Sequence, residues 1–454
     1  MRLLFLTPGT GSYYCGVCMR DNALVRELCR QGHDAMLLPL YLPLTLEEAA
    51  ATPGAPVFFG GLNVYLQQKF PWFRHAPRWV DRLLDDPRLL SWLGRFSGMT
   101  QGPEIGALTY SMLRGEDGAQ AKEVDKLVEW IRAGQNADKR DGSGIERQGR
   151  PDAVWLSTGL LVGVARRIQT ELGVPVFCSL QGEDSFLDGL PEPWRTRCWE
   201  EAGRRCAELR GLVAPSRFYA ERMRGLLGLE AGKVAVVPNG MSLEGYEGAR
   251  GGASEERGTG GGGVVGYLAR FCEGKGLGAV VDAFVELRRR GRVPGVRLEC
   301  AGTMSAGDEA YLELQKAKLR AAGLERDAAF HPNVSREEKV DFLRGLSLLS
   351  VPASYGEAFG LYLIEAMACG VPVVQPRTAA FEEIVQETGG GELVEGFGAE
   401  TLAAGWEALL LDPARARALG EAGARAVRER YAMERMAERF ARFSRGGLGL
   451  EGGQ

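Results

Sequence analysis

Two glutamates, Glu357 and Glu365, flank the start of a predicted helix. The sequence around them reads SVPASYGEAFGLYLIEAMACGVPVVQP from position 350. This pattern predicts a buried strand, a short polar loop, a helix from about Gly360 to Cys369 and then another strand. Glu357 falls on the loop and Glu365 about one turn inside the helix. Because a carboxylate accepts two strong hydrogen bonds, both residues suit sugar or ribose hydroxyls.

The same helix start is a candidate anion site. The backbone amides of Phe359, Gly360 and Leu361 would point out of the helix N-terminus, where anions bind. Gly360 has no side chain, so a ligand can approach the backbone closely there. The segment therefore predicts a diphosphate site with one carboxylate on each side. The alternative is an ordinary capped helix with Glu365 in solvent.

Two cations on one loop form a second candidate site. In GYLARFCEGKG, positions 266–276, a strand ends near Leu268 and the following turn carries Arg270 and Lys275. Arginine offers a planar fork of donors and lysine a point charge, so the two can converge on a pyrophosphate. Solvated loop cations are the alternative. The pyrophosphate interpretation is favoured because the two cations follow the first strand of the series that also contains the two glutamates.

Polar residues also follow a strand nearer the N-terminus. In CSLQGEDSF, from position 178, Gln181, Glu183 and Asp184 stand at the carboxyl end of a buried strand. Open α/β sheets bind ligands at that end of their strands. The two carboxylates are therefore candidates for holding an acceptor hydroxyl, and helix capping by Asp184 is the alternative.

The loop after the first strand, TPGTGSYYCG, is glycine-rich. It does not match G-x-G-x-x-G, because Tyr14 stands at the position of the third glycine, and no acidic residue follows the second strand. Both departures argue against NAD or FAD. What remains is a flexible loop in which Gly16 opens a helix, able to approach a ligand bound by the opposite domain.

Apolar runs alternate with helical patterns along the whole chain, which predicts βαβ units and doubly wound parallel sheets. A glycine-rich stretch, GARGGASEERGTGGGG, divides two such series near residue 248 and predicts a flexible connection. The first series contains the expected strands Arg2–Thr7, Ala35–Leu40, Ala153–Ser157, Val174–Leu180, Gly211–Ala214 and Val234–Val237. The second contains the expected strands Val264–Leu268, Val296–Ala301, Leu348–Val351, Val371–Val374 and Glu392–Val394.

Residues 41–150 interrupt the alternation and predict an insertion in the first domain. Val57–Leu66 alternates like a hairpin, and residues 136–150 have the composition of a solvated loop. Residues 69–96 interleave Phe and Trp with Lys and Arg. A helical insertion with a core of aromatic side chains is one interpretation. The other is a surface that binds the acceptor or anionic membrane headgroups.

Composition limits the class of protein. The 454 residues carry a formal net charge of −4, with 45% hydrophobic and 25% charged residues, which is typical of a soluble globular chain and argues against a nucleic-acid binder. The N-terminal apolar run is too short for a signal peptide, and no run approaches a membrane span. We therefore expect a cytoplasmic protein. Three histidines and the lack of a D-x-D motif predict no metal site.

These motifs, taken in order, resemble the retaining nucleotide-sugar glycosyltransferases of family four, which have the GT-B fold. The markers cover most of the chain and end in the E-x7-E element EAFGLYLIE, followed by AMACGVPVV. The others are GVCMRDNALVRELCRQGHD, VAPSRFYAERM, VVPNGM and GYLARFCEGKG. The resemblance implies two Rossmann-like domains facing across a cleft, namely 1–247 on the acceptor side and 248–428 on the donor side. It also implies a helix, roughly Glu429–Phe443, that crosses back to the first domain before a frayed tail ending at 454.

The resemblance also implies roles at matching positions. Arg270 and Lys275 would neutralise the donor diphosphate, and Glu365 would bind the ribose hydroxyls. Glu357 would contact the donor sugar, with the amides of Phe359, Gly360 and Leu361 assisting. The loop at Gly16 would close over the donor, and the backbone carbonyl at Gln181 would face the reacting sugar. Many members have Gly-Gly where this chain has Cys15–Gly16, and His where it has Gln181.

The implied reaction is metal-independent transfer with retention, by front-face attack of an acceptor hydroxyl on a nucleoside diphosphate-sugar. A UDP-sugar is favoured over GDP- or ADP-sugars, and no cofactor is expected. The acceptor would be a glycan, a lipid-linked molecule or a small molecule, with peripheral contact to the inner membrane face through residues 69–96 as a further hypothesis. The alternatives are a GT-B epimerase or phosphorylase, and a nucleotide-sugar binder without activity.

Overall fold

The computed structural model describes residues 1–9, 16–46, 48–59, 102–136, 149–246 and 262–449. Its contacts divide the chain into two compact units. Unit 1 contains Met1–Pro238 and Met436–Gln454, and unit 2 contains Asn239–Arg435. The boundary between the two units follows Pro238, whereas the sequence predicted it in the glycine-rich stretch that begins near residue 248.

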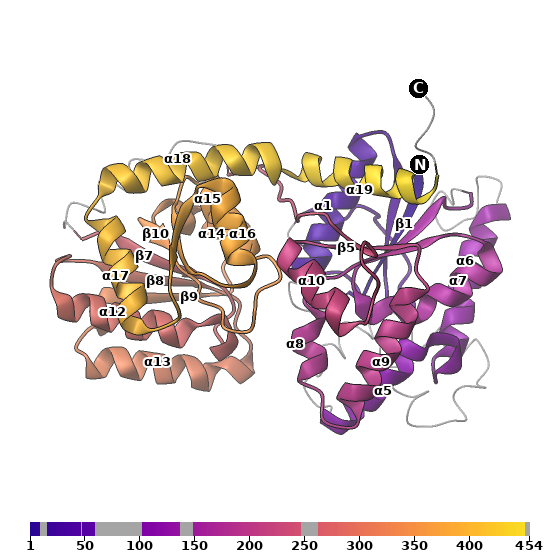
Figure 1. Cartoon of the computed structure of the whole chain (residues 1–454), viewed down its shortest axis with the longest axis horizontal. Helices are drawn as coiled ribbons and strands as arrows, with labels where there is room; N and C mark the ends of the chain where they lie inside the picture. The colour runs from indigo at the N-terminus through magenta and orange to yellow at the C-terminus, as the bar shows by residue number, and fades with distance from the viewer. Residues whose placement is uncertain (10–15, 47, 60–101, 137–148, 247–261, 450–454) are drawn as a thin grey trace. The chain divides into compact units, whose positions relative to one another are not determined.

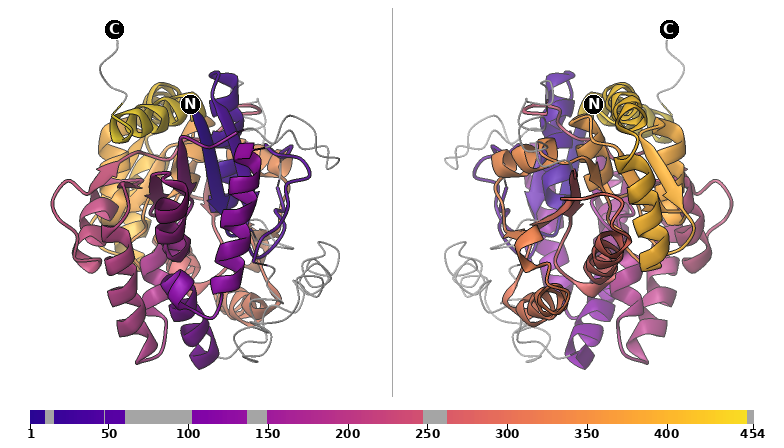
Figure 2. Two further views of the ribbon diagram at one scale, coloured as in Figure 1. Left: turned by 90° about the vertical axis from the view of Figure 1, so that its right-hand side faces the viewer. Right: turned by 90° about the vertical axis from the view of Figure 1, so that its left-hand side faces the viewer.

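In the described part of unit 1, six parallel strands form one sheet (Figures 1 and 2). Their spatial order is β2 (Asp34–Pro39), β1 (Arg2–Thr7), β3 (Ala153–Leu156), β4 (Val176–Ser179), β5 (Gly211–Ala214) and β6 (Val234–Val236). Every residue of β3, β4 and β5 is buried, which explains their uninterrupted apolar sequences. The helices of this unit are α1 (Gly16–Arg30), α5 (Gly102–Arg114), α6 (Ala121–Asn136), α7 (Ala165–Leu172), α8 (Glu183–Asp188), α9 (Trp194–Ala207) and α10 (Arg217–Leu226).

The last helix, α19 (Met433–Gly447), packs on the sheet of unit 1. The Trp155 ring of β3 lies 4.7 Å from the Phe440 ring, centroid to centroid. The Trp155 indole N–H donates a hydrogen bond of 3.1 Å to the Ser444 hydroxyl. Burying a ring of this size stabilises the packing by roughly 2–3 kcal/mol. The helix predicted at roughly Glu429–Phe443 corresponds to α19, which begins at Met433 after α18 (Pro413–Arg430) has ended.

In the described part of unit 2, six further strands form a second parallel sheet. Their spatial order is β12 (Gly391–Val394), β11 (Val373–Pro376), β10 (Leu348–Leu349), β7 (Val264–Leu268), β8 (Arg297–Gly302) and β9 (Ala328–Pro332). Besides α18, its helices are α12 (Leu277–Arg290), α13 (Glu309–Ala321), α14 (Arg336–Arg344), α15 (Leu361–Ala368), α16 (Ala379–Thr388) and α17 (Ala399–Leu410). Helix α12 packs beside α13 and α17, and α15 beside α14 and α18, and Figure 1 shows these groups on opposite faces of the sheet.

The two sheets confirm the predicted doubly wound α/β architecture, and each has a point where the strand order reverses. In unit 2, β7 pairs with β8 on one side and β10 on the other. In unit 1, β1 lies between β2 and β3. Ligands of open α/β sheets bind outside the carboxyl ends of strands at such a reversal. A ligand-binding site in unit 2 is therefore expected at the loops after β7 and β10.

Strand β9 was not predicted. Its sequence, AAFHP, is short and ends in proline, and the strand lies at the sheet edge with its last two residues exposed. An edge strand covered on one side carries a weaker apolar pattern than a central one, so this sequence did not stand out.

The structure describes residues 41–46, 48–59, 102–136 and 149–150 of the predicted insertion. Helices α5 and α6 show that its later half contains helices. At the start of the predicted hairpin, Phe58 forms a parallel bridge with Leu40, and residues 60–66 lie outside the described part of the chain. The aromatic and basic segment 69–96 lies outside it as well. None of the helices that the structure describes is both long enough and apolar enough to cross a membrane.

Candidate functional site

The loops after β7 and β10 touch each other in unit 2. The amide of Ser354 donates a 3.1 Å hydrogen bond to the Gly274 carbonyl oxygen. Gly276 has a φ of +79°, and a Cβ built on it would lie 2.2 Å from the Pro352 carbonyl oxygen. Because only glycine permits this contact, the sequence GKG brings Lys275 against the loop that holds Glu357.

Lys275 and Glu357, both predicted site residues, form an ion pair. The Lys275 Nζ lies 2.5 Å from Oε2 of Glu357. The hydroxyls of Tyr355 and Tyr362 donate to the same oxygen at 2.8 and 3.0 Å. The ammonium also lies 4.9 Å from the Tyr355 ring centroid and 5.6 Å from that of Tyr362. Three donors and two rings therefore hold the pair in one arrangement.

The phenol of Tyr362 acts as a donor to Glu357. Its pKa is raised well above the usual value, first because the ring is buried and then because the Glu357 carboxylate is close. No hydrogen bond from the described residues reaches Oε1 of Glu357. The carboxylate is thus fixed through one oxygen, and the other is left to accept hydroxyls.

The N-terminus of α15 lies on the same loop. Gly360 is the N-cap with a φ of +91°, a conformation that favours glycine. Among the described residues, no acceptor takes up the amides of Phe359, Gly360 or Leu361. The first amides of a helix carry part of the positive end of its dipole. The structure therefore places open amides and the Lys275 ammonium around one loop, as expected for a diphosphate site.

Glu365 lies on α15, one turn beyond that loop. Its Oε1 accepts a hydrogen bond of 2.8 Å from the Lys339 ammonium and one of 3.1 Å from the Tyr246 hydroxyl. Burial raises the pKa of Tyr246, and the nearby Glu365 carboxylate raises it further, so Tyr246 is a donor here. Within the described ranges no bond reaches Oε2 of Glu365. In each glutamate of the motif, one carboxylate oxygen therefore accepts hydrogen bonds from protein side chains. The other accepts none from the described residues and is called the open oxygen below.

Arg270 lies on the same β7 loop, but its guanidinium pairs with another group. Its Nε and Nη2 atoms lie 3.0 Å from Oδ2 and Oδ1 of Asp308, respectively, in the loop after β8. Burial of Asp308 opposes its ionisation, but hydrogen bonds from Arg270 and Ser305 outweigh this and hold its pKa below the usual value. The Arg270 side chain is 54% exposed. In this arrangement, much of its donor fork is directed at a protein carboxylate.

The carboxylates after β4 in unit 1 are buried and internally bonded. Glu183 accepts hydrogen bonds from the Thr158 hydroxyl, the Gln181 amide and the Tyr219 hydroxyl at 2.7 to 3.0 Å. Asp184 lies 3.0 Å from the same Tyr219 hydroxyl, whose one proton the two carboxylates share, and accepts a 2.6 Å hydrogen bond from Arg222. The prediction that Glu183 and Asp184 hold an acceptor hydroxyl is therefore wrong.

The helix-capping alternative for Asp184 is wrong too, since Gly182 is the N-cap of α8. Burial removes both carboxylates from solvent, and their hydrogen bonds fix the loop that carries Gln181. Gly16 is the exposed first residue of α1. The loop before it, residues 10–15, lies outside the described ranges, so closure over a donor stays a prediction.

Two family models match the chain. One, described as a glycosyl transferase 4-like domain, matches residues 19–240. The other, described as glycosyl transferases group 1, matches residues 255–426. The chain belongs to the glycosyltransferases of family four. The E-x7-E element, the α15 amides and the Lys275 loop all fall inside the second match.

Related proteins agree with this family. The chain is 30% identical over 264 residues to a D-inositol 3-phosphate glycosyltransferase of Segniliparus rotundus, covering 56% of this chain and 58% of the relative. It is 32% identical over 234 residues to a protein of the same name from Xylanimonas cellulosilytica, covering 50% and 54%. The matches thus span a little over half the length of these relatives.

Solved structures confirm the GT-B fold of this family-four chain. Sucrose-phosphate synthase from Thermosynechococcus elongatus superposes with a TM-score of 0.70 at 17% identity, covering 99% of this chain and all of the other. Anabaena HepE in complex with UDP superposes with a TM-score of 0.65 at 16% identity, covering 98% and 99%. At these identities the likeness concerns the fold alone.

Sequence reasoning missed four residues that touch the two motif glutamates. Tyr355 and Tyr362 are close to Glu357 in sequence, and their spacing around a loop and a first helical turn was a signal that could have found them. Lys339 and Tyr246 are 26 and 119 positions from Glu365. No local pattern links them to it.

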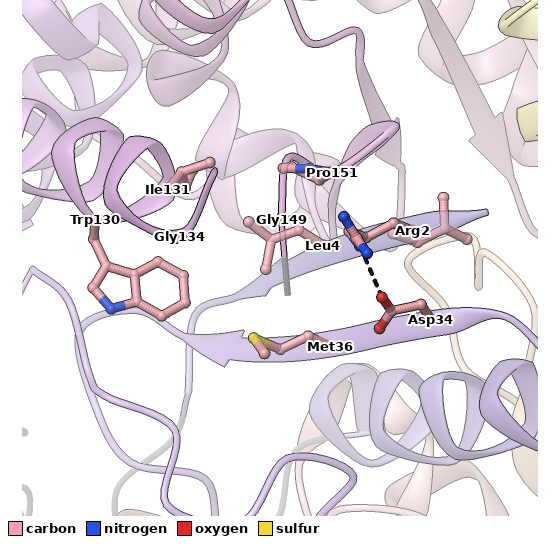
Figure 3. A pocket seen from close by; sticks show the side chains of 10 residues that line it. Arg2, Leu4, Asp34, Met36, Trp130, Ile131, Gly134, Gly149 and Pro151 are labelled. Carbon is pink, nitrogen blue, oxygen red and sulfur yellow. Dashed lines mark hydrogen bonds and ion pairs between the residues drawn. The ribbon is translucent and has the colours of Figure 1, made fainter. Parts of the chain in front are cut away.

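Two cavities of the family-four chain lie away from the carboxyl ends of the strands. Figure 3 shows one in unit 1, beside the 2.8 Å ion pair between Arg2 and Asp34 at the amino ends of β1 and β2. The other, in unit 2, is lined by residues at the amino ends of β7 and β8, including Val264 and Arg297. Ligands of open sheets bind at the opposite strand ends, so neither cavity replaces the loops around Lys275 as the candidate donor site.

Proposed function

We propose that the chain is a retaining glycosyltransferase that moves a sugar from a nucleoside diphosphate-sugar to an acceptor hydroxyl without a metal ion. The observation that carries this proposal is the grouping, at the strand reversal of unit 2, of the Lys275–Glu357 pair, the open α15 amides and Glu365. They supply a cation, an anion-binding helix end and two carboxylates with one open oxygen each. A donor made of a ribose, a diphosphate and a sugar needs such a set.

The chemistry follows from the charge that develops when the sugar–phosphate bond breaks. The leaving diphosphate gains negative charge while the sugar becomes oxocarbenium-like. Donors that are fixed in advance stabilise such charge most effectively. Lys275 and the α15 amides are fixed in this way. Arg270 would add its charge by sharing its guanidinium between Asp308 and the diphosphate.

The open oxygens would hold the two sugars of the donor. Oε1 of Glu357 would accept a hydroxyl of the transferred sugar, and Oε2 of Glu365 the ribose hydroxyls. The backbone carbonyl at Gln181, in a loop fixed by Glu183, would face the reacting sugar. The departing diphosphate would take the proton of the acceptor hydroxyl on the same face, so the configuration is retained.

Related proteins guide the choice of substrates. HepE was solved with UDP and with UDP-glucose, which supports a UDP-sugar as the donor. The curated relatives are named for D-inositol 3-phosphate, which makes a phosphorylated polyol the first acceptor to test beside glycans and lipid-linked acceptors. Contact with a membrane through residues 69–96 remains a hypothesis about a segment outside the described residues.

A release assay tests this function. The protein is incubated with a panel of UDP-, GDP- and ADP-sugars, with and without acceptor, and free nucleoside diphosphate and product mass are measured. We expect release from a UDP-sugar that depends on the acceptor, with a product heavier by one sugar. Conversion of the nucleotide-sugar without acceptor would instead identify an epimerase. Tight binding with no turnover for any acceptor would identify a binding protein.

A further inference from the structure

We propose that Lys339 and Tyr246 are positioning residues for donor recognition: they hold one oxygen of Glu365 and thereby present the other to the ribose hydroxyls. This inference rests on the proposed function, because it needs a ribonucleotide at Glu365. Lys339 and Tyr246 belong to none of the motifs that carry the family resemblance. Their role is read from contacts that only the folded chain creates.

Both groups reach the same carboxylate atom. The Lys339 ammonium lies 2.8 Å from Oε1 of Glu365, and the Tyr246 hydroxyl lies 3.1 Å from it. The side chains of Lys339 and Glu365 are 16% and 18% exposed, and Tyr246 is 3% exposed. Because these side chains are largely shielded from solvent, a charge-assisted hydrogen bond between them is strong and well directed. Two donors on Oε1 fix the plane of the carboxylate, so the lone pairs of Oε2 have one direction.

Helix α14 fixes Lys339 and Tyr246 relative to each other. That helix begins with a capping box in which the hydroxyl of Ser335 and the carboxylate of Glu338 bond each other's backbone amides. Lys339 lies one turn into it. From the same helix, Arg336 donates at 2.8 Å to the Glu244 carbonyl, and Arg344 donates at 2.9 Å to the Gly245 carbonyl.

Helix α14 also contacts the Tyr246 ring directly. The Arg336 guanidinium lies 5.8 Å from its centroid. Helix α14 therefore anchors the segment that carries Tyr246 and also supplies Lys339. Glu365 is therefore bonded by Lys339 of α14 and by Tyr246, whose chain segment is itself hydrogen-bonded to α14.

Charge gives a second reason for Lys339. A donor brings a negatively charged diphosphate to the loop before α15, and Glu365 lies one turn into that helix. Like charges in a partly dehydrated site repel each other. The ammonium of Lys339 compensates the Glu365 carboxylate, so that Glu365 can accept ribose hydroxyls without opposing the diphosphate.

The experiment compares two ligands that share the same diphosphate. The affinities of UDP and of 2′,3′-dideoxyuridine diphosphate are measured by calorimetry for the wild-type chain and for Lys339→Met, Tyr246→Phe and Glu365→Gln. The ratio of the two affinities isolates ribose recognition, because changes in diphosphate attraction cancel. Lys316→Met is the matched control, since Lys316 forms an exposed ion pair of 2.8 Å with Glu313 on α13.

We expect the wild-type chain to prefer UDP. Lys339→Met should lower this preference about tenfold, and Tyr246→Phe about threefold, because the first loses a 2.8 Å hydrogen bond between charged groups and the second a 3.1 Å bond from a neutral donor. Lys339→Arg should restore most of it, and Lys316→Met should leave it unchanged. Melting temperatures confirm that each variant is folded. If Lys339→Met unfolds, the ratio of the two affinities is compared between Tyr246→Phe and Lys339→Arg instead.

The outcomes separate the two claims. If Glu365→Gln loses the preference while Lys339→Met and Tyr246→Phe keep it, the positioning role is overturned and the proposed function stands. If the wild-type chain binds neither UDP, GDP nor ADP, the proposed function fails, and the positioning role fails with it. If Lys339→Met weakens both ligands equally, Lys339 acts only through its charge, and the positioning role is overturned.

Discussion

Replacing Lys275 by methionine removes the ammonium that pairs with Glu357 on the loop before α15. Methionine keeps most of the aliphatic length against the rings of Tyr355 and Tyr362, so the loss is mainly electrostatic. The Lys275 side chain is 24% exposed. Two unit charges about 4 Å apart interact by about 1 kcal/mol in water and about 4 kcal/mol at an effective dielectric constant of 20.

The partial burial of Lys275 places the transition-state loss toward the upper end of that range, at about 3 kcal/mol. This corresponds to a decrease in kcat/KM of about 10² to 10³, which is the scale of losing one preorganised donor. The assay is release of the nucleoside diphosphate at saturating acceptor. Lys316→Met again serves as the control that removes a lysine from an exposed ion pair.

A double variant sharpens the prediction. In Lys275→Met alone, Glu357 becomes an uncompensated carboxylate beside an anionic leaving group. Adding Glu357→Gln removes that repulsion, so the double variant should lose at least about 1 kcal/mol less than the sum of the two single variants. Near-normal turnover in Lys275→Met, or strictly additive losses, would refute the reasoning.

The other predictions concern single atoms of the site. Tyr362→Phe removes one of three donors to Oε2 of Glu357 and should lower kcat/KM about tenfold, without loss of fold, in the same release assay; unchanged turnover would contradict this. Gly360→Ala should cost about 1–2 kcal/mol in urea unfolding and weaken diphosphate binding, whereas Gly370→Ala, with a φ of +73° at the other end of α15, should lose stability only. The pair of Asp308 with Arg270 should stabilise the fold above the unfolded pKa of about 4 and cease to do so as pH falls through the lowered folded pKa. Unfolding titrations of the wild-type chain and Asp308→Asn should therefore differ at pH 6 and converge in acid, and a constant difference would argue against the pair.

Much of the fold was predictable because the central strands of both sheets, such as β4, β5 and β11, are buried along their whole length. Strands such as Gly211–Ala214 and Val264–Leu268 appear where their apolar runs placed them. The edge strand Ala328–Pro332 escaped prediction because one side of it is not covered, which weakens the pattern. The last helix begins at Met433, a few residues after the predicted start at Glu429, because α18 continues to Arg430.

The candidate site was predictable where its residues are neighbours in sequence. The loop, the glycine and the helix start that follow β10 are one segment, and its spacing indicated both carboxylates and amides. Which oxygen of each carboxylate is occupied depends on side chains from elsewhere, such as Lys339. The same limit explains Glu183, whose pattern suggested ligand binding, because its burial by Thr158 and Tyr219 is a tertiary effect.

The most direct test is a crystal structure of the chain soaked with UDP. The account predicts the diphosphate within hydrogen-bond distance of the Lys275 ammonium and of an amide among Phe359, Gly360 and Leu361. It also predicts a ribose hydroxyl on Oε2 of Glu365. A diphosphate bound at any other strand end, with Lys275 and Glu357 still closed on each other and no ligand at α15, would contradict it.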